Sequence, residues 1–179
     1  MTKERNAGKA IIILCIGTFF FLIYPVLVEG VNQGEWEARA LTLGDAGNWY
    51  ELIVFCQERI KEYPENFSAW LLLGTAFHQI QHYDEAIDAF RRAVLINPEN
   101  AGTWLILGKS YYMAENYDQA IVAFRQSLVI DPKNVETLET LAHAYILSND
   151  RTAALGVFRE LNRLDPERAN KLFDLIMPR

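Results

Sequence analysis

Two histidines, His78 and His82, stand four residues apart in the sequence. On a helix this spacing places both imidazoles on one face, where they could hold a metal ion such as zinc. A stable site needs a third ligand, and no other ligand residue is spaced to meet these two. We therefore expect no metal site in this chain.

The potential nucleophiles are also isolated. Ser110 and Ser127 have no histidine base at a recognisable spacing, and Cys56 is of a type that more often packs in a core than attacks a substrate. The sequence contains no glycine-rich loop of the kind that cradles phosphate. We expect the protein not to be an enzyme, and to use no cofactor and no small-molecule substrate.

The apolar residues are unevenly spread. The chain has 179 residues, of which 51% are apolar and 22% charged, but residues 10–28 form a run of 19 without a charge. As a helix this run would span roughly 28 Å, which is close to the thickness of a bilayer's hydrocarbon core. The sequence therefore predicts a transmembrane helix at residues 10–28.

Three alternatives compete with the membrane helix. A cleaved signal peptide would have a shorter apolar region and small residues before the cut, whereas this run ends in Pro-Val-Leu-Val followed by Glu29. A lipoprotein signal would need a small residue before its cysteine, but Cys15 follows Ile13 and Leu14. A buried core helix of this length would carry a polar stripe, and this run has none.

The charges around the run predict its orientation. Lys3, Arg5 and Lys9 precede it, whereas Arg39 is the single basic residue in the twenty that follow. By the positive-inside rule, residues 1–9 form a cytoplasmic tail and the rest is exported, into the periplasm in a bacterium. The linker at residues 29–34 is short, so the exported part should lie close to the membrane.

The net charge and the cysteines limit the partners and the covalent links. The formal charge is −6 and the part after residue 28 has no basic cluster, which argues against binding nucleic acid or acidic lipid headgroups. Cys15 would lie in lipid and Cys56 in the soluble part, so the two should not form a disulfide.

A repeat of 34 residues organises most of the chain. Three units begin at Phe67, Ala101 and Val135, and the same residue types recur at fixed positions in each. The fourth position holds Trp70, Trp104 and Leu138; the eighth Gly74, Gly108 and Ala142; the eleventh Phe77, Tyr111 and Tyr145; the twentieth Ala86, Ala120 and Ala154; the twenty-fourth Phe90, Phe124 and Phe158; and the thirty-second Pro98, Pro132 and Pro166.

This pattern resembles the tetratricopeptide repeat, a helix-turn-helix unit, over residues 67–168. The resemblance implies an all-α solenoid with repeats at 67–100, 101–134 and 135–168. We expect the small residue at the eighth position to meet the alanine at the twentieth, as Gly108 would meet Ala120, and the aromatic residues to fill the space between units. The Asp or Asn before each proline should cap the next turn.

The two ends of the array are less regular. Residues 35–66 are interpreted as a degenerate first repeat, with Trp36, Trp49 and Pro64 in register but Arg39 and Cys56 out of character. The alternative is a pair of ordinary helices that abut the array. Residues 169–179 are expected to form a capping helix. Its apolar face should consist of Leu172, Leu175 and Ile176, and Leu161 should pack against it.

In a tetratricopeptide array, positions 2, 5, 9, 12 and 13 line a concave groove that binds protein partners. The corresponding candidate residues are Leu71, Thr75, His78, Gln79, Leu105, Lys109, Tyr112, Met113, Glu139, His143 and Ile146, with Ser68, Gly102, Glu136 and Leu147 beside them. For the apolar members the alternative is packing against a neighbouring helix.

The groove composition indicates the kind of partner. The subgroup that grips acidic chaperone tails has lysine and asparagine where this chain has Leu71 and Thr75, so that clamp is absent. Apolar side chains with few charges favour an apolar helix or an extended peptide, and methionine adapts to varied shapes.

Together these features suggest a single-pass, membrane-anchored adaptor that assists the assembly or stability of a membrane or envelope complex. The layout of one anchor and about three repeats is similar to that of assembly factors for cytochrome c maturation and for photosystem I, which is an analogy only. The alternative is a permanent structural subunit of a membrane complex.

Overall fold

The computed structural model describes residues 33–177, and its regular secondary structure there is entirely helical. The predicted cytoplasmic tail at 1–9 and membrane helix at 10–28, with most of the linker, lie outside the described residues. Between residues 33 and 177, no helix has the length and apolar character needed to cross a bilayer.

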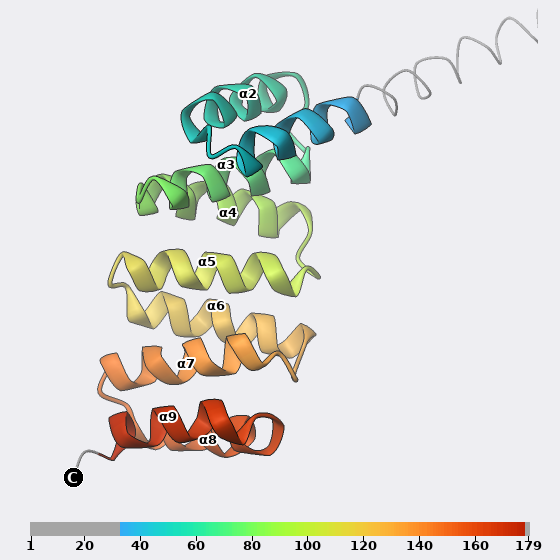
Figure 1. The fold of residues 1–179 in the computed structure, drawn as a ribbon. Coiled ribbons are helices and arrows are strands. Elements are labelled where there is room, and N and C mark those ends of the chain that lie inside the picture. Colours follow the sequence, from blue (N-terminus) through green and yellow to red (C-terminus); the bar gives the residue numbers. More distant parts are fainter. Residues whose placement is uncertain (1–32, 178–179) are drawn as a thin grey trace, which may run out of the picture.

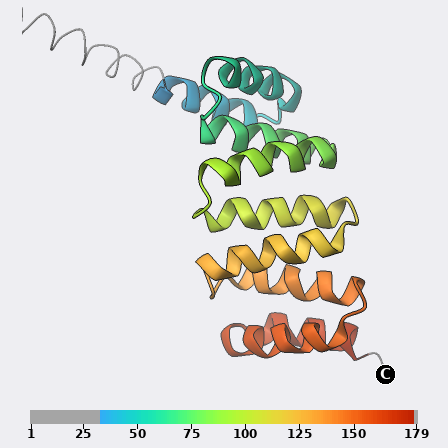
Figure 2. The same cartoon turned by 180° about the vertical axis from the view of Figure 1, so that it is seen from behind.

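The helices stack in chain order from one end of the molecule to the other (Figures 1 and 2). Residues 33–45 are helical, and each later helix packs against the one before it. These later helices are α2 (Trp49–Glu62), α3 (Phe67–Gln79), α4 (Tyr83–Ile96), α5 (Ala101–Met113), α6 (Tyr117–Ile130), α7 (Val135–Leu147), α8 (Arg151–Leu164) and α9 (Pro166–Ile176). The predicted all-α repeat array is thus confirmed over the described range.

The joint between repeats is capped by a residue that the sequence interpretation missed. Asn66, Asn100 and Asn134 each accept a backbone hydrogen bond through the side chain, at the first turns of α3, α5 and α7. The expected caps, Asn97 and Asp131, instead close the preceding helices α4 and α6. The proline and the residue after it form a turn, so the helix that begins at the expected start of the next repeat is preceded directly by the asparagine and not by the residue before proline.

The turn inside each repeat is also the same in all three units. Gln81, Glu115 and Asn149 adopt left-handed backbone angles, with φ of 63°, 60° and 64°. The residue after each one donates its N–H back to the last turn of the first helix, as Asn116 does to the carbonyl of Tyr111 at 2.9 Å. This arrangement is a Schellman motif, which ends the helix and reverses the chain.

The two helices of a repeat approach closely through a glycine and a phenylalanine. A Cβ added to Gly74 would lie 2.6 Å from the ring of Phe90, and one added to Gly108 would lie 2.5 Å from the ring of Phe124. The atoms nearest to Gly108 are thus those of the ring at the twenty-fourth position, which the sequence interpretation did not assign as its partner; Ala120, the expected partner, is also fully buried.

The third repeat has a different arrangement at the same place, since alanine replaces the glycine. Ala142 is buried, but Phe158 is only half-buried, unlike Phe90 and Phe124 in the other two repeats. The ring of Phe158 instead packs 5.7 Å from the ring of Phe173 on α9. In the third repeat the ring thus takes part in the contact with the last helix as well as in the core cluster that includes Ala142.

The first helical pair continues the array. Trp36, Leu52 and Cys56 are buried in one cluster with Leu73 and other residues of α3. Arg59 is buried between two aromatic rings, with its guanidinium carbon 4.1 Å from the ring centroid of Tyr63 and 5.6 Å from that of Trp36. Such stacking lets a charged side chain remain in a largely apolar setting.

The last helix covers the open end of the core. It begins at Pro166, with Asp165 as its cap, and not at residue 169. Leu172 and Ile176 are buried with Leu161, as expected. The prediction for Leu175 was wrong, because its side chain is 53% exposed. The face of α9 that packs on the core is narrow and consists of Ala169, Leu172 and Ile176.

Candidate protein-binding groove

The predicted groove residues come from the first helices of the three repeats, α3, α5 and α7. Helices α5 and α7 contact each other directly, so these first helices form one layer of the array. Gln79 and Met113 are exposed, the latter to 48%. The residues of intermediate exposure are Leu71, Thr75, His78, Lys109, Tyr112, Glu139, His143 and Ile146.

Leu105 is the exception within this set. Its side chain is only 7% exposed and packs in a cluster with Phe124 and Leu141. For the apolar candidate residues of the groove, the sequence left open the alternative that they pack against a neighbouring helix, and Leu105 does so. The side chain of Leu105 supports the interface between repeats and offers little surface to a partner.

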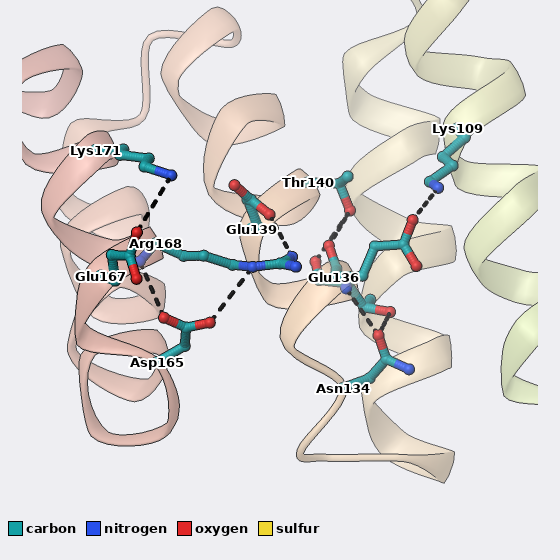
Figure 3. Close-up of polar contacts among 10 residues, drawn as sticks. Lys109, Asn134, Glu136, Glu139, Thr140, Asp165, Glu167, Arg168 and Lys171 are labelled. Carbon is teal, nitrogen blue, oxygen red and sulfur yellow. Dashed lines mark hydrogen bonds and ion pairs between the residues drawn. The ribbon is translucent and has the colours of Figure 1, made fainter.

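Polar contacts link the first helices from one repeat to the next. Ser68 on α3 donates to Glu37 in the helix at residues 33–45 at 2.9 Å. Lys109 on α5 pairs with Glu136 on α7, and Arg168 on α9 pairs with Glu139 on α7 at 3.0 Å (Figure 3). Arg168 also contacts Asp165 at 3.4 Å, so its guanidinium lies between two carboxylates.

These contacts occupy most of the charge on the layer. Exposed pairs of this kind contribute only about 0–1 kcal/mol to stability, so their main effect is on what the surface offers to a partner. A charged partner would have to displace a charge that is already paired. The side chains free of such pairing at this surface are neutral, with Tyr112 and Met113 the largest on α5.

His78 is fixed by a contact between repeats. Its Nδ1 lies 2.9 Å from Oγ of Ser110, and that hydroxyl donates its proton to the carbonyl of Ile106 at 3.0 Å. A serine hydroxyl has one proton, so Nδ1 of His78 is the donor to Ser110. Burial and then the nearby positive charge of Lys109 lower the pKa of His78, which favours the neutral ring.

His82 makes different contacts from its neighbour. Its Nδ1 lies 3.2 Å from Glu85, and its ring stacks on Phe77. The two imidazoles are therefore engaged by separate groups and do not converge. Within residues 33–177, no three His, Cys, Asp or Glu side chains gather in a group that could hold a metal ion.

Position 12 of each of the first two repeats meets an aromatic ring of the following helix. The ring of Tyr112 lies edge-on to Tyr117 with centroids 5.6 Å apart, and His78 meets Tyr83 in the same way at 5.3 Å. Burial and then Tyr117 raise the pKa of Tyr112, so its hydroxyl stays neutral. Tyr112 is therefore held in position as a neutral, half-buried side chain.

Cys56 has the properties of a packing residue. Its side chain is fully buried in the first helical pair, and burial raises the pKa of its thiol to about 12. A reactive cysteine needs a lowered pKa and access to solvent, and Cys56 has neither.

Two family models match the chain, both described as tetratricopeptide repeat, over residues 67–100 and 111–172. The chain is a tetratricopeptide repeat protein. Repeats of this family form scaffolds for protein–protein interaction and are typically non-catalytic. A comparison with curated proteins found no significant match.

Solved structures of other repeat proteins share the fold. A crystal structure of MamA is 17% identical with a TM-score of 0.69, covering 76% of this chain and 91% of that one. MamA from residue 41 onward, from Desulfovibrio magneticus RS-1, is 20% identical with a TM-score of 0.69, covering 73% and 74%. YrrB, described as a tetratricopeptide repeat protein with an unusual peptide-binding site, is 16% identical with a TM-score of 0.68, covering 79% and 82%.

Proposed function

We propose that the groove of this protein binds a largely apolar segment of a protein partner, as an apolar helix or an extended peptide. The observation that carries the proposal is the pairing of the groove charges, through which Lys109, Glu136 and Glu139 each have a partner within the array. What remains to meet a partner is neutral and in good part apolar.

The largest neutral side chains of the groove lie at positions 12 and 13 of the repeats. Tyr112 is held by Tyr117, while Met113 and Leu147 are exposed on successive first helices. A rigid aromatic side chain loses little entropy on binding, and methionine adapts to the shape of the partner. This combination supports an apolar ligand centred on α5.

We further propose that residues 10–28 anchor the protein in a membrane, with residues 1–9 in the cytoplasm and the array exported. The support is the uncharged run and the basic residues Lys3, Arg5 and Lys9 before it. A groove held near the bilayer suits a factor that assists the assembly or stability of a membrane complex, such as one for cytochrome c maturation or a photosystem, by analogy of layout.

A permanent subunit of a membrane complex is the second candidate, favoured by the same anchor. The two differ in stoichiometry. An assembly factor is substoichiometric and absent from the finished complex, whereas a subunit co-purifies with it at a fixed ratio in mild detergent.

The test of groove binding is the double variant Tyr112→Ala/Met113→Ala in the full chain. Crosslinking in native membranes followed by mass spectrometry should show a partner that the variant retains at least tenfold less well, since buried anchors at an interface carry about 2 kcal/mol or more. The matched control is Tyr50→Ala/Val54→Ala, which removes exposed side chains from α2. Equal retention by both variants would exclude the groove as the binding surface.

A further inference from the structure

The second helices of the three repeats carry an arginine at the same position. Arg91 on α4, Arg125 on α6 and Arg159 on α8 are spaced by 34 residues, and all three are exposed. Within the described part of the chain, none of the three forms a salt bridge. The charges on this side of the array are therefore available, in contrast to those of the groove.

Exposed apolar side chains accompany two of these arginines. Leu95 and Val129 follow Arg91 and Arg125 by four residues, on the same face of their helices, and are 74% and 75% exposed. The equivalent positions in the flanking second helices hold Lys61 and Arg163. The apolar side chains are thus specific to α4 and α6.

The same residues line two hollows. One of about 220 Å³ lies between α4 and α6 over α5, and its lining includes Arg91, Leu95, Trp104, Leu107 and Val122. The other, of about 430 Å³, lies on α6 and is lined by Val122, Arg125, Gln126, Leu128 and Val129. The first hollow sets one guanidinium among apolar side chains of three helices, so it could accept an apolar side chain next to a carboxylate. The second combines the same kinds of group on the surface of α6 alone.

We propose that this face of α4, α6 and α8 binds a second protein segment, one that carries carboxylates interspersed with large apolar side chains. Guanidinium groups bind carboxylates through charge-assisted, often paired hydrogen bonds, and the hollows take the apolar side chains. This interaction is separate from the proposed groove binding, so a protein with both surfaces would join two partners.

An anionic membrane is the other class of partner that basic and apolar residues suggest, and the surroundings disfavour it. Asp84 and Asp88 share a third hollow with Arg91, so carboxylates lie near one of the three arginines. A flat anionic surface would have to approach these carboxylates, whereas a linear segment can follow the arginines and avoid them.

The test measures binding of a fluorescein-labelled peptide of alternating glutamate and leucine to the detergent-solubilised full chain. Fluorescence anisotropy should show that the variant Arg91→Glu/Arg125→Glu/Arg159→Glu binds at least tenfold more weakly than the unaltered chain. The matched control, Arg92→Glu/Lys133→Glu/Lys171→Glu, has the same net charge and changes other exposed positions. A lysine–leucine peptide of equal length should not bind.

A second variant keeps the test decisive if the charge reversals impair folding. Replacing the same three arginines by glutamine removes the positive charges without adding negative ones and should still weaken binding severalfold. Equal affinity of the arginine and control variants for the acidic peptide would overturn the proposal. The proposal would also be overturned by a labelling experiment on the variant Leu95→Cys in phosphatidylcholine vesicles. If maleimide labelling of this cysteine falls when phosphatidylserine is added to the vesicles, this face of the protein contacts lipid.

Discussion

The contact between glycine and phenylalanine makes a quantitative prediction about the core of each repeat. Gly108 and Gly156 both lie inside helices, but a Cβ on Gly108 would come within 2.5 Å of the Phe124 ring, whereas one on Gly156 would meet open space. The substitution Gly→Ala should therefore have opposite effects at the two positions.

The magnitudes follow from two opposing contributions. Replacing glycine by alanine in a helix gains about 0.8–1.0 kcal/mol, so Gly156→Ala should stabilise the protein by about that amount. At Gly108 the same gain is offset by overpacking, which typically costs about 1–3 kcal/mol, since a buried ring has little room to move. The free energies of unfolding of the two variants should thus differ by about 1–3 kcal/mol.

The assay is thermal and urea unfolding of the full chain, followed by circular dichroism. For a protein of this size, 1 kcal/mol corresponds to about 2–4 °C in the melting temperature. Adding Phe124→Leu to Gly108→Ala should recover part of the loss, because the smaller side chain makes room for the methyl group. If Gly108→Ala stabilises as much as Gly156→Ala, the assigned contact between the helices is incorrect.

Four further predictions concern single features. Leu105→Ala should lower the free energy of unfolding by about 2–5 kcal/mol in urea titration, because it opens a cavity between repeats; a change below 1 kcal/mol would contradict its burial. Asn134→Ala should cost about 1 kcal/mol by removing the cap of α7, and no change would refute that role. Because the pKa of His78 is lowered by folding, the unfolded chain binds more protons just below pH 6.5, so stability should fall as the pH drops there. His78→Gln should flatten that dependence, and an unchanged slope would assign it to other groups. Finally, a reporter active only outside the cytoplasm and fused after Arg179 should be active, whereas activity of a cytoplasmic reporter would reverse the proposed orientation.

The repeat made the helices and much of the core predictable. Residues such as Trp104, Leu107 and Phe124 recur at fixed offsets because every unit must bury the same faces against its neighbours. Periodicity identifies which positions face inward, but not which side chain meets which. This is why the partner of Gly108 was assigned to Ala120 and not to the ring of Phe124.

The joints and the groove show a second limit. Asn100 caps α5, but the sequence interpretation gave this role to Asn97, the residue before proline. Asparagine is a good capping residue at either position, and only two residues separate Asn97 from Asn100. Leu105 belongs to the groove positions of the repeat, but its side chain packs in the core with Phe124 and Leu141. Side-chain packing, not residue type, settled its position.

The arginines of the second helices are part of the same repeat. Arg91, Arg125 and Arg159 recur at an offset of 34 residues, as the core residues do. Their common position is therefore predictable from the sequence. Their lack of ion pairs, by contrast, depends on the three-dimensional neighbours and could only come from the structure.

The most direct test of the proposed function is a photocrosslinking amino acid placed at Met113 in the full chain and activated in native membranes. The proposed groove predicts a protein adduct of defined mass from this position, weakened by Tyr112→Ala and absent when the crosslinker replaces the exposed Glu99 in the joint after α4. The absence of any adduct from Met113, or equal adducts from both positions, would contradict binding in the groove.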